Sequence, residues 1–204
     1  MSKIAIIGAT GRAGSQLLEE ALRRGHSVTA IARNVESIDV KPGVTVKQVD
    51  ALNAVELQQA ISGNDVVISA AHFATVPAES IIEPVKKAGV KRLLVVGGAG
   101  SLLLPSGERV IDSAGFPEEY RAEASAGSVF LDKLRQEKEL DWSFLSPSAE
   151  FVEDIRTGDF RLGQNHLLIS EKGRSWISFS DYAIALIDEV EVPKHSRERF
   201  TVGY

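Results

Sequence analysis

The stretch that most constrains the fold is a glycine loop at the start of the chain. An apolar run ends at Ile7. It is followed by Gly8, Gly11 and Gly14 at three-residue spacing, and then by an amphipathic stretch that continues to Arg24. Glycines in such a loop allow a tight turn, a close approach of the backbone to a pyrophosphate, and close packing of the following helix. The loop therefore predicts a phosphate-binding strand–loop–helix unit, and the alternative is a glycine turn that binds nothing.

Short β-branched runs alternate with helical patterns through the first two thirds of the chain. This alternation is typical of repeated strand–helix–strand units around a parallel sheet. We expect strands at 3–7, 27–32, 44–49, 65–70, 92–96 and 142–145, and helices at 12–24, 54–61, 77–87 and 118–139. The predicted fold class is α/β, a Rossmann-like doubly wound parallel sheet with a small C-terminal appendage.

The expected elements become shorter after Pro147. They are strands within 158–169, 175–178 and 199–202, and a helix over 181–189 that Asp181 or Ser180 would cap. Because no repeat or linker divides the chain, we expect one NAD(P)-binding domain over 1–204. Within it, 147–204 would contribute the appendage on the substrate side.

Composition narrows the classes of partner. The net charge is −5, the charges are interspersed, and no long basic run is present, which disfavours nucleic acid. The chain contains no cysteine, and we expect no metal site, no membrane span and no secretion signal. We therefore expect a cytoplasmic protein whose partner is a small molecule, and the choice between monomer and homodimer stays open.

The end of the second expected strand bears on which dinucleotide is bound. Ala32 is followed by Arg33 and Asn34, and no carboxylate is present there to take the ribose hydroxyls of NAD. Arg33 offers a planar fork of donors for the 2′-phosphate of NADP, and Arg12 would reach the same phosphate from the other side. NADP(H) is therefore favoured over NAD(H), with a solvated surface charge as the alternative for Arg33.

Small and polar residues follow three further strands, at the edge where open parallel sheets bind ligands. They are Asp50 and Ala51, then Ala70, Ala71 and His72, then Gly97, Gly98 and Ser101. Small side chains let a flat cofactor lie close to the backbone. His72 is a candidate substrate contact or proton donor, and the alternative is an ordinary loop residue.

Several longer motifs carry a family resemblance. They are GATGRAG (8–14), IARN (31–34), VVGGAGSL (95–102), LDWSFLSPSAEF (140–151) and ISFSDYAIALIDE (177–189). Together they resemble the atypical short-chain dehydrogenase/reductase superfamily, specifically its NADH-flavin reductase group, which is related to NmrA-like and biliverdin reductase B-like NAD(P)-binding proteins.

The resemblance implies roles for residues at the strand ends. Thr10, Arg12 and Ala13 would contact phosphate, Asp50 and Ala51 would flank the adenine, Ala70 and Ala71 would line the ribose, Gly97 and Gly98 would approach the nicotinamide, and Pro147 to Phe151 would cover it. Most of these positions coincide with those that the strand pattern already selects.

The sequence departs from the superfamily at its usual catalytic pair. In Tyr-x-x-x-Lys the lysine lowers the pKa of the tyrosine, but here Tyr120 is followed four positions on by Ala124, and Tyr182 by Leu186. Flavin reduction tolerates this loss, because hydride passes directly between stacked rings. We therefore expect an NAD(P)H-dependent oxidoreductase that reduces a flavin or a similar flat acceptor.

Three polar side chains, Ser101, His72 and Glu150, are the candidate catalytic groups that would orient such an acceptor. Ser101 is also explained as a residue that stiffens its glycine loop, and Glu150 as a solvated charge. Two other functions stay open. One is a non-catalytic NADP-binding redox sensor of the NmrA type; the other is a nucleotide-sugar epimerase, for which the segment after Pro147 is short.

Overall fold

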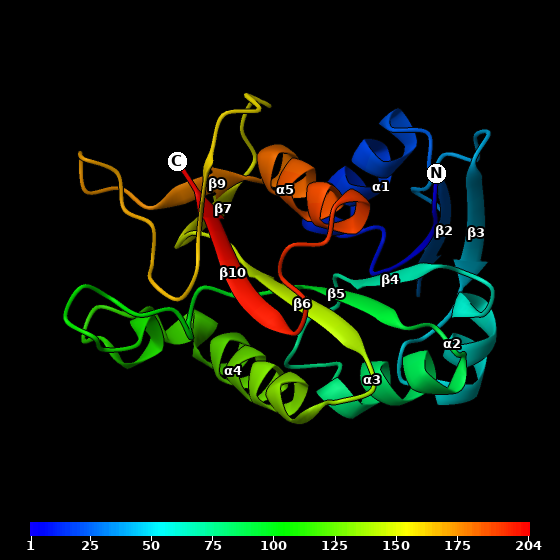
Figure 1. The fold of residues 1–204 in the computed structure, drawn as a ribbon, viewed down its shortest axis with the longest axis horizontal. Helices are drawn as coiled ribbons and strands as arrows, with labels where there is room; N and C mark the ends of the chain where they lie inside the picture. The colour runs from blue at the N-terminus through cyan, green and yellow to red at the C-terminus, as the bar shows by residue number, and fades with distance from the viewer.

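Eight strands form the central sheet of the computed structural model, which describes residues 1–204. The strands are β1 (Lys3–Ile7), β2 (Ser27–Ala32), β3 (Val44–Gln48), β4 (Val66–Ser69), β5 (Arg92–Val96), β6 (Asp141–Ser146), β8 (Arg161–Gly163) and β10 (Glu198–Gly203). Their order is β3-β2-β1-β4-β5-β6-β10-β8, and all neighbours pair in parallel except β8 with β10 (Figure 1). Because the chain winds outward from β1 in both directions, the predicted α/β doubly wound fold is confirmed.

Helices cover both faces of the sheet (Figure 1). One face carries α1 (Arg12–Arg23) and α5 (Phe179–Glu191), and the other carries α2 (Ala54–Ile61), α3 (Ala78–Lys87) and α4 (Arg121–Gln136). None of these helices is both long enough and apolar enough to span a membrane.

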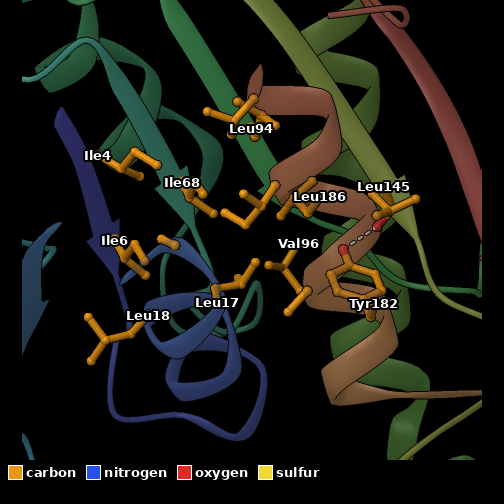
Figure 2. Close-up of a cluster of buried hydrophobic side chains, with 14 of the residues drawn as sticks. Ile4, Ile6, Leu17, Leu18, Ile68, Leu94, Val96, Leu145, Tyr182 and Leu186 are labelled. Atoms are coloured by element: carbon orange, nitrogen blue, oxygen red, sulfur yellow. Dashed lines mark hydrogen bonds between the residues drawn. The ribbon is translucent and has the colours of Figure 1, made fainter. Parts of the chain in front are cut away.

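Each face has its own apolar core, and β1 shows how the sequence divides between them. Ile4 and Ile6 pack with Leu17 of α1 and Leu186 of α5, as Figure 2 shows, whereas Ala5 belongs to the core on the other face. Successive side chains of a strand point to opposite faces, so a strand covered on both sides must be apolar throughout. This is why the strands read as continuous β-branched runs.

The C-terminal third contributes to both the main body and a small separate sheet. β10 extends the central sheet next to β6, and α5 packs against α1. β7 (Glu150–Val152) and β9 (Trp176–Ser178) pair in parallel outside the central sheet. The sequence predicted β9 but not β7, whose three residues find their partner strand only through a long-range pairing.

Most expected boundaries differ from the structure by one or two residues, and two expected elements differ by more. The helix expected over 118–139 begins as a 3₁₀ turn at Glu118–Tyr120 and ends at Gln136. Glu137 has an extended backbone conformation, and its carboxylate accepts hydrogen bonds from the N–H groups of Glu139 and Leu140. Within the segment 158–169, Arg161–Gly163 pairs with β10, and beyond it His166 forms only an isolated bridge with Leu103.

The expected cap of α5 is also wrong. Ser178, rather than Ser180 or Asp181, is the N-cap, and its Oγ accepts a hydrogen bond from the N–H of Asp181 at 3.0 Å. The carboxylate of Asp181 is left free for other partners. Tyr182 in the next position is fully buried, as expected from its apolar surroundings.

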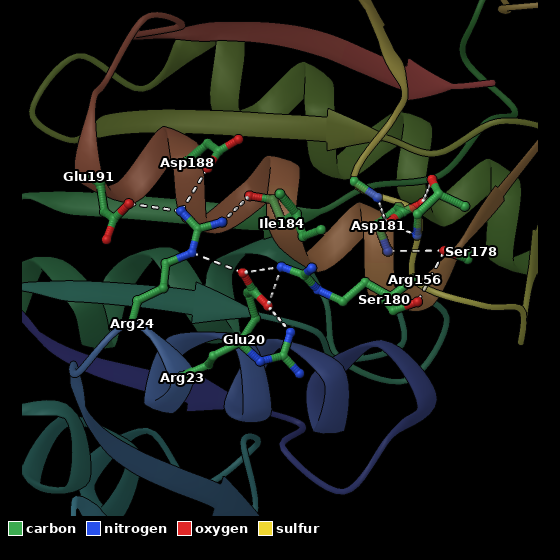
Figure 3. Close-up of polar contacts among 12 residues, drawn as sticks. Glu20, Arg23, Arg24, Arg156, Ser178, Ser180, Asp181, Ile184, Asp188 and Glu191 are labelled. Atoms are coloured by element: carbon green, nitrogen blue, oxygen red, sulfur yellow. Dashed lines mark hydrogen bonds and ion pairs between the residues drawn. The ribbon is translucent and has the colours of Figure 1, made fainter.

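A buried carboxylate links α1 and α5, the two helices that cover one face of the sheet. Glu20 of α1 accepts hydrogen bonds from Arg23, Arg24 and Arg156 at 2.8, 2.9 and 3.2 Å, and Arg24 also contacts Asp188 of α5 at 2.6 Å (Figure 3). Burial acts to raise the pKa of Glu20, but the hydrogen bonds from Arg24 and Arg156 outweigh it and hold that pKa below its ordinary value. The cluster therefore favours folding as long as Glu20 is ionised.

Replacing this carboxylate tests its contribution to stability. We expect Glu20→Gln to lower the free energy of unfolding at neutral pH by about 1–3 kcal/mol, since the charged acceptor is lost. Because folding lowers the pKa of Glu20, the stabilisation disappears as the pH falls through that lowered pKa. Urea unfolding at about pH 7 and about pH 3 gives the free energy of unfolding of the wild type and of Glu20→Gln. The difference between these two free energies must be smaller at the lower pH. Glu19→Gln, at an exposed neighbour paired with Lys41, is the control and leaves stability nearly unchanged.

Candidate functional site

The loops that follow the parallel strands meet at one edge of the sheet. Ile7, at the end of β1, pairs with Ile31 of β2 and Ser69 of β4, and Ser69 pairs with Val95 of β5. The following loops therefore begin side by side, at the point where the strand order reverses. Open α/β sheets bind ligands in the crevice at this position.

The glycine loop is shaped by close backbone packing. Gly8 has a φ of +81°, and a Cβ on it would lie 2.7 Å from the carbonyl oxygen of Ala70. A Cβ on Gly14 would lie 2.1 Å from the carbonyl oxygen of Gly8. These two contacts explain the first and third glycines of the motif, and they hold the start of α1 against the end of β1.

The start of α1 offers free hydrogen-bond donors. Gly11 is the N-cap, no side chain caps the helix, and the first helical hydrogen bond runs from the N–H of Ser15 to the carbonyl of Gly11 at 2.8 Å. The N–H groups of Arg12, Ala13 and Gly14 have no acceptor in the protein. Free N–H groups at a helix N-terminus fit a phosphate, so this end of α1 can hold a pyrophosphate.

The structure separates the two arginines that the sequence assigned to one phosphate. Arg33 is exposed at the end of β2, where its carbonyl accepts a hydrogen bond from Gln48. The guanidinium of Arg12 lies 5.3 Å from the ring centroid of Phe179, on α5. Figure 1 places α5 and β2 on opposite sides of α1. Arg33 is therefore the arginine at the β2 side, and Arg12 lies on the α5 side.

The two glycines after β5 have different reasons to be glycine. A Cβ on Gly97 would lie 2.4 Å from Cε1 of Phe144, and the N–H of Gly97 donates to Leu145 at 2.8 Å, so Gly97 serves the packing of β5 on β6. No atom lies within 4 Å of the position that a Cβ on Gly98 would take. The backbone at Gly98 therefore faces open space, as a contact surface for a flat ring requires.

The other predicted cofactor residues follow the same strand ends. They are Thr10, Gly11 and Ala13 around the start of α1, Asn34 after β2, Asp50 and Ala51 after β3, Ala70 and Ala71 after β4, and Pro147 after β6. Asn34 and Asp50 each accept a hydrogen bond from an N–H two residues on, so both side chains also shape their own loops.

The three candidate catalytic side chains have separate partners, and no contact joins any two of them. The Oγ of Ser101 accepts a hydrogen bond from Arg199 at 3.3 Å. Glu150 is paired with Arg174 at 2.7 Å, and the hydrogen bond from Arg174 lowers the pKa of Glu150. The structure does not assemble the three into one catalytic group.

His72 lies on the loop after β4, and its partner is a residue that the sequence analysis missed. The exposed imidazole has its Nδ1 3.5 Å from a carboxylate oxygen of Glu123 on α4. Glu123 also accepts hydrogen bonds from the N–H groups of Phe73 and Ala74, at 2.8 and 2.9 Å. Glu123 thus fixes this loop, and no local pattern predicts a partner about fifty positions away.

None of the three tyrosines forms a catalytic pair with a lysine. Tyr182 is buried, its hydroxyl donates to the carbonyl of Leu145 at 2.7 Å, and burial raises its pKa. Tyr204 donates to Asp181 at 2.7 Å, and Tyr120 lies exposed on the 3₁₀ turn. The structure therefore offers no activated tyrosine as a proton donor at the strand ends.

A cavity of about 350 Å³ lies beside the glycine loop. Its lining comes from three separate parts of the chain, namely Thr10, Arg12, Ser15, Gln16, Glu153, Asp154, Phe179 and Ser180. Of these residues, only Thr10 and Arg12 are predicted from the sequence to contact a ligand. The acidic residues were missed because their segment reaches the cavity through the tertiary structure alone.

Solved structures of similar proteins cover essentially the whole chain. A "putative epimerase" from Bacteroides thetaiotaomicron is 45% identical, with a TM-score of 0.94 and coverage of 100% of this chain and 97% of that one. A "putative exported protein" from Burkholderia pseudomallei is 40% identical, with a TM-score of 0.90 and full coverage of both chains. A "putative NADH-flavin reductase" from Streptococcus pneumoniae TIGR4 is 35% identical, with a TM-score of 0.87 and coverage of 100% and 99%.

Sequence comparison gives the family. "Uncharacterized protein YwnB" of Bacillus subtilis (strain 168) is 40% identical over 211 residues, which span 98% of this chain and 97% of that protein. A family model described as NAD(P)H-binding matches residues 8–190. These matches confirm the predicted resemblance to NAD(P)-binding proteins, among them one described as an NADH-flavin reductase. With its glycine loop, its free helix N-terminus and its open strand ends, the chain belongs to the NAD(P)H-binding family.

Proposed function

We propose that this protein is an NADPH-dependent oxidoreductase that passes hydride to a flavin or a similarly flat acceptor. The observation that carries the proposal is the open backbone at Gly98, which follows β5 in the same edge of the sheet as Ala70 and Ala71. A nicotinamide ring lying on these small residues would keep its other face free. A flat acceptor could stack on that face within reach of the hydride.

The residues of the site divide the binding of the dinucleotide among them. The free N–H groups of Arg12, Ala13 and Gly14 would hold the pyrophosphate, and Arg33 would hold the 2′-phosphate that distinguishes NADPH from NADH. When bound, the reduced dinucleotide supplies the hydride. The protein's contribution is then chiefly to position the two rings, because the structure offers no activated tyrosine.

The relative described as an NADH-flavin reductase supports this type of acceptor. The direct test is to follow NADPH oxidation by the purified protein on adding free flavin mononucleotide. We expect oxidation that scales with protein concentration. Tight NADPH binding without turnover across flavins, quinones and carbonyls would instead favour the second candidate, a redox sensor, which the absence of an activated tyrosine suits equally.

Replacing Arg33 tests the choice of NADPH. We expect Arg33→Ala to raise the Kd for NADPH at least about tenfold, since a charge-assisted hydrogen bond to the 2′-phosphate is lost, and to change the Kd for NADH little. Titration of both dinucleotides by fluorescence measures this. Arg12→Ala is the matched control, because Arg12 lies on the α5 side and its loss should affect both dinucleotides alike. An equal loss for both dinucleotides in Arg33→Ala would refute the NADP assignment.

The two glycines after β5 give a second test. Gly98→Ala places its methyl group in open space, so we expect an unchanged Tm but NADPH binding weakened by roughly tenfold, because the methyl group would meet the ring. Gly97→Ala is expected to lower stability by about 1–3 kcal/mol, because its Cβ meets Phe144. Thermal unfolding and NADPH titration of both variants separate the two roles. Unimpaired binding by Gly98→Ala would contradict the proposed ring surface.

The relative described as an epimerase supports a third candidate function, the epimerisation of a nucleotide sugar. We place nucleotide-sugar epimerisation last, because it needs a base at the sugar hydroxyl. Tyr182 and Tyr204 are hydrogen-bonded within the protein, and Tyr120 lacks a lysine four positions on. A cytoplasmic location is also part of the proposal. Because one relative is described as exported, detection of the native protein in fractionated cells is the measurement that decides its compartment.

A further inference from the structure

A short segment forms part of the cavity wall and is hydrogen-bonded to both α1 and α5. We call residues 153–159 the strap; they follow β7 and extend from the cavity wall toward α1 and α5. Glu153 and Asp154, at its start, line the cavity together with Thr10 and Arg12 of the glycine loop. The position of the strap therefore sets the shape of the space beside the pyrophosphate end of the site.

One buried carboxylate holds the far end of the strap. Asp181 of α5 has no exposed surface and accepts hydrogen bonds from the N–H of Thr157 at 3.0 Å, the N–H of Gly158 at 2.9 Å, the hydroxyl of Thr157, and the hydroxyl of Tyr204 at 2.7 Å. Ser178 already caps α5, so the carboxylate is not needed as the cap. A buried charge is costly unless such donors surround it, and three of these donors come from the strap.

Two further contacts hold the strap, one from each helix. Arg156 contacts the buried Glu20 of α1 at 3.2 Å, and the hydroxyl of Ser180 on α5 donates to the carbonyl of Asp154 at 3.3 Å (Figure 3). Both helices that begin at the cavity thus hold the segment that walls it. Among these attachments, that to Asp181 is the most buried and has the most donors.

We infer that Asp181 is a positioning residue, which holds the strap against the cavity beside the glycine loop and thereby sets the affinity for the dinucleotide. The inference rests on the proposed dinucleotide site. Without the carboxylate, the N–H groups of Thr157 and Gly158 lose their charged acceptor, and the wall formed by Glu153 and Asp154 is no longer preorganised. Binding would then have to order the strap, and this cost would weaken the affinity for the dinucleotide.

The experiment compares Asp181→Asn with Asp188→Asn. Both residues lie on α5, but Asp188 is half-exposed and contacts Arg24 rather than the strap. We expect Asp181→Asn to raise the Kd for NADPH about tenfold, and the KM for NADPH in step with it, with kcat little changed. Asp188→Asn should bind as the wild type does. Thr157→Val removes one donor from the strap without altering α5 and should raise the Kd about threefold.

Limited trypsin digestion reports on the strap itself, because Arg156 lies within it. Mass spectrometry of the fragments should show faster cleavage after Arg156 in Asp181→Asn than in Asp188→Asn. Bound NADPH should slow this cleavage in the wild type. Circular dichroism shows whether each variant is folded, and if Asp181→Asn does not fold, Thr157→Val decides.

The possible failures are distinguishable. If the wild type binds neither NADPH nor NADH, the proposed function fails and this inference fails with it. If the wild type binds NADPH and the folded Asp181→Asn binds it as tightly as Asp188→Asn, the inference alone is overturned, whatever the cleavage rate. If Asp181→Asn does not fold, a wild-type Kd for NADPH in Thr157→Val overturns the inference in the same way.

Discussion

The approach of α1 to the end of β1 is the contact on which the rest of the structure depends. Gly14 lies so close to the carbonyl of Gly8 that not even a methyl group would fit between them. This contact fixes the N-terminus of α1 over the carboxyl edge of the sheet. The free N–H groups there face the crevice only because the helix starts at that point, so the phosphate site is a consequence of backbone packing.

The same helix connects the glycine loop to the C-terminal third. Glu20, two turns further along α1, contacts Arg24 on its own side and Arg156 in the strap, and Arg24 continues the contact to Asp188 on α5. The carboxylate is buried and its charge is held by arginines from two parts of the chain. The site is therefore assembled around α1, with strand-end loops on one side and the strap on the other.

Much of the fold could be predicted because its causes are local. The strands 3–7, 27–32 and 92–96 and the helix 54–61 agree with the structure to the residue, since β-branched runs, apolar periodicity and flanking glycines occur within each segment. The errors arise where a distant partner decides. The helix α5 begins at Phe179, so Ser178 is its cap and the carboxylate of Asp181 accepts hydrogen bonds from Thr157 and Gly158 instead; likewise, β7 forms only because β9 lies beside it.

The sequence by itself determined the fold class, the glycine loop and the set of strand ends, because spacing and composition within short windows carry that information. Only the tertiary structure decided that Gly97 packs while Gly98 faces open space, that Arg12 lies on Phe179 and apart from Arg33, and that the strap walls the cavity. Each of these depends on side chains far apart in the chain. Such contacts form only when the sheet order and the helix packing bring them together.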